Sequence, residues 1–443
     1  MVQRVGVVGA GTMGAGIAQL ACMGRFETYL HDPVSDALEA GATRLRQALV
    51  KGAERGRWSA GAAEAAASRL REAARLEDLG GCELVIEAAP EDLELKRELF
   101  KGLAGVCGPE AILATNTSSL SVSAISADVD LPERICGMHF FNPPALMRLV
   151  EVVAGERTTE PTLATADEVA RAMGREPIRA ADAIGFVANR TARPFTLEAL
   201  RLLGEGVATH DQIDRIVRIG GGFRMGPFEL MDLVGVDVNY EVAKSFWEQG
   251  SHEPRWEPHP IQAEMVAEGR IGRKAGRGYY DYGHGPHRPD DPEPNDRDPG
   301  WSQDHEIESS LHFEAFPTLD TATLVELART PPTASDNDAA EAYFRSMGTH
   351  VERVDDVPGL VLGRILAQIV NEAHFAVGEG VATPEDVDVA MRLGFNWPRG
   401  PFEWTDAIGP ARLVGVLDAL GSELDAERYR VAPLLIQARS SRS

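Results

Sequence analysis

Short apolar runs alternate with amphipathic segments through residues 1–183, a pattern typical of strands and helices that follow one another along the chain. The apolar runs are dense in Val, Leu and Ile and lack a polar alternation, which favours strands buried on both faces. We predict such strands at 4–8, 26–31, 84–88, 111–115 and 149–153, with helices at 15–23 and 93–103 and a helical hairpin at about 35–75. The pattern predicts a mostly parallel sheet flanked by helices.

Beyond residue 184 the apolar positions follow helical spacing, and we expect a first helical domain at 184–282. The segment 283–300 is rich in Pro, Asp, Gly and Arg and cannot bury enough apolar surface to form a core. We therefore expect a linker and a vestigial segment at 283–335, followed by a second helical domain at 336–443.

An internal repeat supports this division. The hexapeptide Gly-Glu-Gly-Val-Ala-Thr at 204–209 recurs at 378–383, and Gly-Pro-Phe-Glu at 226–229 recurs at 400–403. Met173-Gly174 recurs as Met347-Gly348, and all three pairs are 174 residues apart without a gap. The sequence therefore predicts that the helical domain is duplicated.

The two copies differ at positions where chemistry is expected. Asn189 is replaced by Gly363, and no second glycine-rich loop precedes the second copy. His312-Phe313 and Leu324-Val325-Glu326 faintly resemble the pair His139 and Glu151 described below, but the histidine and the glutamate are fourteen residues apart rather than twelve. We interpret the second copy as degenerate and without activity.

Composition narrows the classes of function. The net charge of −24 argues against a nucleic-acid surface or an anionic membrane, and no apolar run is long enough to span a bilayer. The four cysteines show no metal-ligand spacing, the chain starts directly with a strand, and no metal site is expected. We expect a cytoplasmic protein with reduced, partly buried thiols.

A glycine-rich loop joins the first predicted strand to the first helix. It reads Gly9-Ala10-Gly11-Thr12-Met13-Gly14, and Asp32 ends the second strand. In such a loop the first glycine permits a tight turn, the second lets the backbone approach a pyrophosphate, and the third lets helix and strand pack closely. Because an acid at Asp32 accepts hydrogen bonds from a ribose 2′-hydroxyl and repels a 2′-phosphate, the motif predicts NAD as the cofactor.

A carboxylate, Glu151, interrupts the apolar run 149–153. It needs a partner if that strand is buried, and His139, in a loop-like stretch at 137–144, lies twelve residues before it. A buried carboxylate fixes the tautomer of its histidine partner, which is the arrangement of a general base. A structural salt bridge, or a glutamate on an edge strand that faces water, is the alternative.

Several longer motifs carry a family resemblance. They are Gly-Met-His-Phe-Phe-Asn-Pro-Pro at 137–144, Leu-Val-Glu-Val at 149–152, Asp-x-x-Gly-Phe-Val-x-Asn-Arg at 182–190 and Met-Gly-Pro-Phe-Glu-Leu at 225–230. With them, residues 1–282 closely resemble the L-3-hydroxyacyl-CoA dehydrogenases, and the second copy resembles the duplicated domain of longer bacterial members. The fold class implied is α/β plus all-α. It comprises an N-terminal Rossmann domain and two tandem helical domains like the C-terminal domain of 6-phosphogluconate dehydrogenase.

The resemblance implies a role for each matching residue. His139 matches the catalytic base, Glu151 the carboxylate that orients it, and Ser118 a serine between substrate and nicotinamide. Asn189 matches an asparagine that reaches the substrate. Residues that match contacts to the dinucleotide are Asp32, Glu91, Lys96, Asn142 and Lys274.

The implied reaction is reversible oxidation of a short or medium 3-hydroxyacyl-CoA to the 3-oxoacyl-CoA. The family's contacts to the CoA nucleotide carry over poorly. They map to Lys51 and Arg55, and Ala48 stands where a serine is expected. That departure keeps open a dehydrogenase of a non-CoA hydroxy acid or sugar acid, and a non-catalytic relative is a third reading. The duplication suggests an intramolecular pseudo-dimer, with a homodimer as the alternative.

Overall fold

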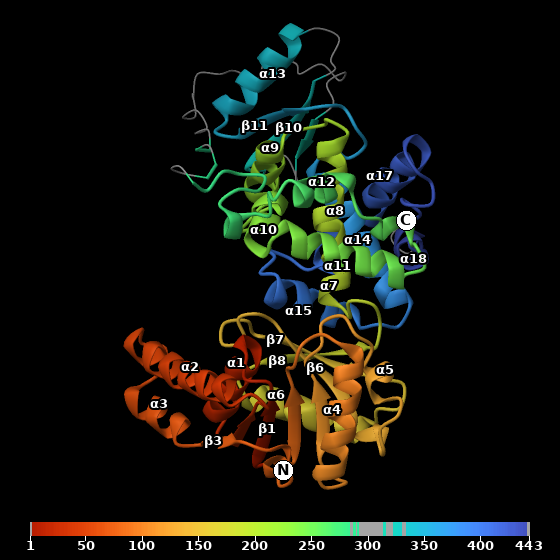
Figure 1. Ribbon diagram of the computed structural model, residues 1–443. Helices are drawn as coiled ribbons and strands as arrows, with labels where there is room; N and C mark the ends of the chain where they lie inside the picture. Colours follow the sequence, from red (N-terminus) through yellow and green to blue (C-terminus); the bar gives the residue numbers. More distant parts are fainter. Residues whose placement is uncertain are drawn as a thin grey trace. The chain divides into compact units, whose positions relative to one another are not determined.

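The computed structural model describes residues 2–283, 287–288, 290–291, 313–315, 322–329 and 334–440. These residues form two compact units (Figure 1). The first contains Met1–Ala188 and Gly380–Gly394, and the second contains Asn189–Glu379 and Phe395–Ser443.

The first unit is built on an eight-stranded sheet of order β3-β2-β1-β4-β5-β6-β7-β8. Neighbouring strands are parallel except for β6 and β7. The strands are β1 (Arg4–Val8), β2 (Glu27–His31), β3 (Leu70–Ala73), β4 (Leu84–Glu87), β5 (Ile112–Thr115), β6 (Ile135–Phe140), β7 (Leu149–Ala154) and β8 (Glu176–Ala181). The helices are α1 (Thr12–Met23), α2 (Ser35–Glu54), α3 (Ala60–Ala67), α4 (Leu93–Val106), α5 (Val122–Ser126) and α6 (Glu160–Ala172). The predicted parallel sheet with flanking helices is confirmed.

Two sequence predictions were wrong in detail. The hairpin of α2 and α3 ends before residue 70, because Leu70–Ala73 pairs in parallel with β2 and buries Leu70 and Ala73 at the sheet edge. His139 does not lie in a loop. It is the fifth residue of β6, where every residue is buried.

One face of the sheet holds the main apolar core. Met138 and Phe140 of β6 and Val150 and Val152 of β7 join the buried cluster that contains residues of α1, α2 and α6. Successive side chains of a strand point to opposite faces, so the intervening His139 and Glu151 point away from this core. The alternation places both polar side chains on the other face of the sheet.

The second unit is mostly helical. Its first helices are α7 (Ala188–Thr191), α8 (Arg193–Gly204), α9 (His210–Arg215), α10 (Pro227–Val234), α11 (Val236–Gln249) and α12 (Pro260–Ala267). The later helices are α14 (Leu362–Gly378), α16 (Pro401–Ile408), α17 (Pro410–Glu423) and α18 (Pro433–Ser440), while α15 (Pro384–Gly394) belongs to the first unit. The elements α10 and α16 coincide after a shift of 174 residues, as do α11 and α17.

The repeat includes strands as well as helices. A three-stranded sheet of β9 (Phe313–Ala315), β10 (Leu324–Ala328) and β11 (His350–Val354), with α13 (Ala334–Ser346), follows the order of β6, β7, α6 and β8. Its first pair is antiparallel and its second is parallel, as in the larger sheet. The segment predicted as linker and remnant therefore contains two strands, although His312 and most of 283–312 lie outside the described residues.

The two helical copies pack together through α8 and α14, with matching ion pairs. Arg190 Nε lies 2.7 Å from Glu372, and its counterpart Arg364 Nε lies 2.9 Å from Glu198, the counterpart of Glu372. The outer pairs also correspond, with Arg190 to Glu379 at 2.8 Å and Arg364 to Glu205 at 2.6 Å. An approximate twofold relation therefore holds within the second unit.

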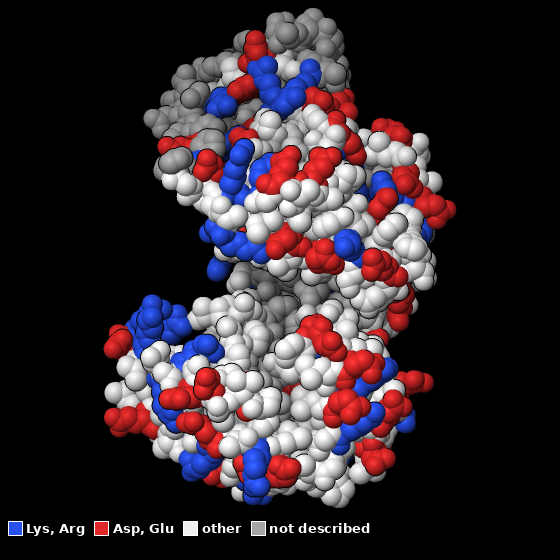
Figure 2. Space-filling model, in the orientation of Figure 1, with Lys and Arg blue, Asp and Glu red and all other residues white. Residues whose placement is uncertain are grey.

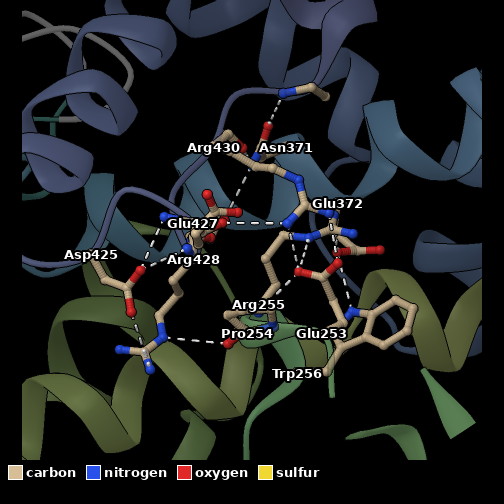
Figure 3. Close-up of polar contacts among 12 residues, drawn as sticks. Glu253, Pro254, Arg255, Trp256, Asn371, Glu372, Asp425, Glu427, Arg428 and Arg430 are labelled. Carbon is tan, nitrogen blue, oxygen red and sulfur yellow. Dashed lines mark hydrogen bonds and ion pairs between the residues drawn. The ribbon is translucent and has the colours of Figure 1, made fainter. Parts of the chain in front are cut away.

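Figure 3 shows the polar contacts around Glu372, one carboxylate of this network. Glu372 accepts from Arg255 at 2.8 Å and from the Trp256 indole at 3.3 Å. Arg430 binds Glu253 at 2.6 Å, and Arg428 donates to the carbonyl of Pro254 at 3.3 Å. Segments far apart in the sequence are thus joined by charged hydrogen bonds.

Within the described residues, no helix has the length and apolar character needed to cross a bilayer.

Candidate active site

The glycine-rich loop has the shape that a dinucleotide requires. Gly9 has φ of +95°, and a Cβ there would lie 2.5 Å from the carbonyl oxygen of Ala88. A Cβ at Gly14 would lie 1.7 Å from the carbonyl oxygen of Gly9, whereas a Cβ at Gly11 would meet no atom within 4 Å. The open space is at Gly11, at the N-terminus of α1, where the backbone approaches a pyrophosphate. The residues present fit NAD.

Asp32 closes the loop from the next strand. Its carboxylate accepts from the backbone N–H of Ala10 at 2.9 Å and from that of Val34 at 3.0 Å. These bonds fix the carboxylate beside the loop at the end of β2. A half-buried carboxylate in this place suits a ribose with two free hydroxyls.

His139 and Glu151 face each other across β6 and β7. They are direct partners in the antiparallel register, and His139 Nδ1 lies 2.6 Å from Glu151 Oε2. Glu151 is fully buried and His139 is 5% exposed. The Nε2 atom of His139 has no hydrogen-bond partner among the residues that the structure describes, so it can take a proton from a bound molecule. The structure brings this predicted pair together.

The other oxygen of Glu151 is held by backbone. Oε1 accepts from the N–H groups of Val187 at 3.0 Å and Ala188 at 2.8 Å. The preceding residues Gly185 and Phe186 have φ of +69° and +48°, and this turn aims both N–H groups at the carboxylate. Three donors thus compensate the buried charge of Glu151.

Two aromatic rings border the imidazole. The ring of Phe141 lies 4.5 Å from that of His139, and the ring of Phe186 lies 5.9 Å from it. Rings packed at these distances restrict rotation of the histidine and keep its environment dry.

A second buried charge pair lies at the carboxyl end of β4. Lys96 is 1% exposed, and its Nζ lies 2.5 Å from Glu87 and 3.4 Å from Glu91. Glu87 is itself fully buried and accepts from Thr115 Oγ1 at 2.7 Å. Lys96 therefore lies beneath Glu91 and supports it, rather than on the surface.

Glu91 organises the loop that carries Ser118. It accepts from Thr117 Oγ1 at 2.7 Å, Ser118 N at 2.9 Å and Ser119 Oγ at 3.0 Å. Burial raises the pKa of Glu91, but the hydrogen bond from Thr117 and the charge of Lys96 outweigh burial, and the pKa is lowered. The ionised carboxylate holds an exposed Ser118 at the carboxyl end of β5.

The remaining predicted residues are more exposed. Asn142 is exposed two residues after β6. Asn189 is half-buried in α7, and Lys274 pairs with Asp237 at 2.7 Å; both belong to the second unit. Lys51 and Arg55 are exposed at the end of α2, where Figure 2 shows a group of basic side chains.

Sequence reasoning missed several of these groups. Glu87, like Glu151, is a carboxylate in an apolar strand, at the end of Leu-Val-Ile-Glu, and that signal could have found it. Asn116, whose side chain accepts from Phe140 N at 2.8 Å, and the N–H pair at 187–188 gave no sequence signal. Backbone donors depend on the turn, which the side-chain pattern does not record.

The cysteines are free and buried, as predicted. Burial raises the pKa of Cys82 and Cys136 to about 12, so these thiols are unreactive. In the described part of the chain, no group of His, Cys, Asp and Glu side chains could hold a metal ion.

Comparison with known proteins places this geometry in a family. The model of the 3-hydroxyacyl-CoA dehydrogenase NAD binding domain matches residues 4–183. The model of the C-terminal domain of the same enzymes matches twice, at 185–282 and 359–441. Both parts of the molecule therefore match one group of enzymes, and the second match falls on the repeat.

Individual relatives agree. The chain is 37% identical to 3-hydroxyadipyl-CoA dehydrogenase of Escherichia coli (strain K12), over 98% of this chain and 97% of that protein. It is 35% identical to the mitochondrial hydroxyacyl-coenzyme A dehydrogenase of Sus scrofa, over 64% of this chain and 92% of that protein. A crystal structure of 3-hydroxybutyryl-CoA dehydrogenase from Escherichia coli K12 matches with a TM-score of 0.94 and 35% identity, covering 100% of this chain and 99% of that one. The chain belongs to the 3-hydroxyacyl-CoA dehydrogenase family and oxidises 3-hydroxyacyl-CoA with NAD as its cofactor.

Proposed function

We propose that His139 is the general base of this oxidation and that Glu151 orients it. The observation that supports the proposal is the 2.6 Å contact between His139 Nδ1 and Glu151, which leaves Nε2 free to receive a proton. The contact fixes the tautomer in which Nδ1 carries the hydrogen and Nε2 carries the lone pair. A carboxylate held in addition by two backbone N–H groups stabilises the imidazolium that forms.

The reaction then divides between the cofactor and the chain. NAD, when bound, supplies hydride acceptance from C3 of the substrate. His139 Nε2 removes the proton of the 3-hydroxyl group, and in the reverse direction it returns that proton to the oxygen. Glu151 orients the imidazole and does not itself take up the proton. Ser118, held by Glu91, positions the substrate oxygen, and Asn189 positions the thioester carbonyl.

Binding of the cofactor and of CoA is assigned to other residues. Gly9 to Gly14 and Asp32 hold the dinucleotide, with Glu91 and Asn142 near the nicotinamide. Lys96 acts through Glu91, because its ammonium is buried and engaged. Lys51 and Arg55 offer exposed positive charge for the CoA phosphates in a chain of net charge −24.

The names of the relatives indicate a length range for the acyl chain of the substrate. Some are named for 3-hydroxybutyryl-CoA, whose chain ends in a methyl group. One is named for 3-hydroxyadipyl-CoA, whose chain ends in a second carboxylate. We propose a substrate of this short length range.

Replacement of the base is the direct experiment. His139→Gln keeps a hydrogen-bonding side chain but removes the basic nitrogen, so turnover of 3-hydroxybutyryl-CoA should fall by about 10³-fold or more. The affinity for NAD, measured by calorimetry, should stay unchanged. His374→Gln, at a buried histidine of the second copy, is the control and should leave turnover intact. Turnover near that of the wild-type enzyme in His139→Gln refutes the assignment.

We further propose a monomeric enzyme of the cytoplasm. The ion pairs that α14 makes with α7 and α8 already pair the two helical copies inside one chain, and buried free cysteines suit a reducing compartment. Light scattering should give the mass of one chain, 47.8 kDa. A mass of two chains contradicts the monomer.

A further inference from the structure

One buried arginine of the second unit has no partner. Arg193, the first residue of α8, is 6% exposed, and its Nε and Nη1 atoms make no hydrogen bond within the described part of the chain. Its guanidinium packs over the ring of Phe246, with Cζ 5.1 Å from the ring centroid. A buried cation without an anion is costly unless something supplies the missing charge.

The neighbouring buried arginines have the carboxylate partners that Arg193 lacks. Arg190, three residues earlier, contacts Glu372 and Glu379, and Arg201 on the same helix pairs with Glu198. Arg255 and Arg364 likewise meet carboxylates. Burial alone lowers the pKa of Arg193, to about 10, with no carboxylate to oppose it. The side chain therefore remains a cation at neutral pH.

Arg193 lies close in the sequence to a residue that is proposed to bind the substrate. Arg193 follows Asn189, the residue assigned to the thioester carbonyl, by four positions along α7 and α8. Asn189 lies in α7 and Arg193 begins α8, but Ala192 between the two helices keeps right-handed helical dihedrals (φ −77°, ψ −13°), so the two residues lie about one turn, or about 6 Å, apart along the helical path. A short acyl chain that starts at Asn189 can reach Arg193 with its far end.

The second copy supports a chemical role. The counterpart of Asn189 is Gly363, and the counterpart of Arg193 is Ala367, which is fully buried in α14. The ion-pairing residues Arg190 and Glu198 keep their types in Arg364 and Glu372. The copies therefore agree where side chains join them and differ at these two positions on one helical face.

We propose that Arg193 binds a carboxylate at the far end of the acyl chain, so that the preferred substrates are ω-carboxylated 3-hydroxyacyl-CoA thioesters. This inference rests on the proposed function. The guanidinium offers its unused Nε and Nη donors to a planar carboxylate, which accepts two of them in parallel. A methyl-terminated chain leaves these donors unpaired, so the arginine discriminates against it.

The test compares two substrates in two enzymes. The wild-type chain should oxidise 3-hydroxyadipyl-CoA with a higher kcat/KM than 3-hydroxybutyryl-CoA. Arg193→Ala, which installs the residue of the second copy, should lower kcat/KM for 3-hydroxyadipyl-CoA by about 100-fold and change that for 3-hydroxybutyryl-CoA by less than about threefold. Arg193→Lys, which keeps the charge but loses the fork, should fall between the two.

Each result has a distinct meaning. The retained activity on 3-hydroxybutyryl-CoA shows that the variant is folded and that the base is intact. Equal losses on both substrates make Arg193 a structural residue and overturn the inference alone. Unchanged kinetics in Arg193→Ala, or a wild-type preference for the methyl-terminated substrate, also overturn it. A wild-type enzyme that oxidises neither thioester overturns the proposed function with it.

Discussion

The sheet around Glu151 and its copy around Glu326 are built in the same way and differ in the residue opposite the carboxylate. Glu326 accepts from the N–H of Val361 at 2.7 Å on Oε2 and from that of Leu362 at 3.0 Å on Oε1, whereas the matching N–H groups of Val187 and Ala188 both donate to Oε1 of Glu151. The preceding turn is also shared. Leu360 has φ of +47° where Phe186 has +48°. The carboxylate and its backbone donors are therefore common to both halves.

The histidine is what separates them. The residue opposite Glu326 in the antiparallel register is Glu314, whereas His139 lies opposite Glu151. Burial raises the pKa of Glu326 to about 8, and the N–H groups of Val361 and Leu362 only partly oppose it. In both halves the carboxylate with its two N–H groups joins a strand to the start of a helix, and only the first half places a histidine opposite the carboxylate, which is the feature that the proposed base requires.

The largest expected effect is the loss of stability when a carboxylate that joins the two helical copies is removed. Glu198→Ala and Glu372→Ala each remove a buried carboxylate that two buried arginines share, so each should lower the free energy of unfolding by about 3–5 kcal/mol. Burial raises the pKa of Glu198, but Arg201 and Arg364 outweigh burial and leave it lowered, in keeping with a charge that is compensated only by its partners.

Chemical denaturation of both variants measures the effect. Glu94→Ala, which removes an exposed pair with Arg97, is the control and should change the free energy by less than about 0.5 kcal/mol. Clearly unequal losses of unfolding free energy in Glu198→Ala and Glu372→Ala contradict the twofold relation between the copies.

A smaller effect is the pH dependence of the free energy of unfolding. Because the pKa of Glu326 rises from 4.5 to about 8 on folding, the folded chain binds the extra proton between these values. Its contribution to stability is complete below pH 4.5 and is lost as the pH rises through about 8. Glu326→Gln should remove this slope, a difference on the order of 3–4 kcal/mol between pH 5 and pH 8.

The measurement is the free energy of unfolding across that pH range in the wild-type chain and the variant. Asp214 is the internal reference, because burial raises its pKa to about 7 and its slope stays in both proteins. Parallel pH profiles for the two proteins exclude a protonated Glu326.

Much of this architecture could be predicted from the sequence. The glycine-rich loop, Asp32 and the buried carboxylate of Glu151 impose local constraints that residue types record directly. The strand at Leu70–Ala73 was missed because Leu70 continues the helical spacing of the hairpin before it. The lack of a partner at Arg193 was also missed, because pairing depends on which distant carboxylates folding brings near.

Turnover in two matched variants tests the central claim most directly. Glu151→Gln and Glu326→Gln make the same change in equivalent strands, and only the first removes a contact to the proposed base, His139. We expect turnover of 3-hydroxybutyryl-CoA to fall by about 10²–10⁴-fold in Glu151→Gln and to stay within about threefold of the wild-type value in Glu326→Gln. Equal turnover in the two variants, whether both retain activity or both lose it, contradicts the account.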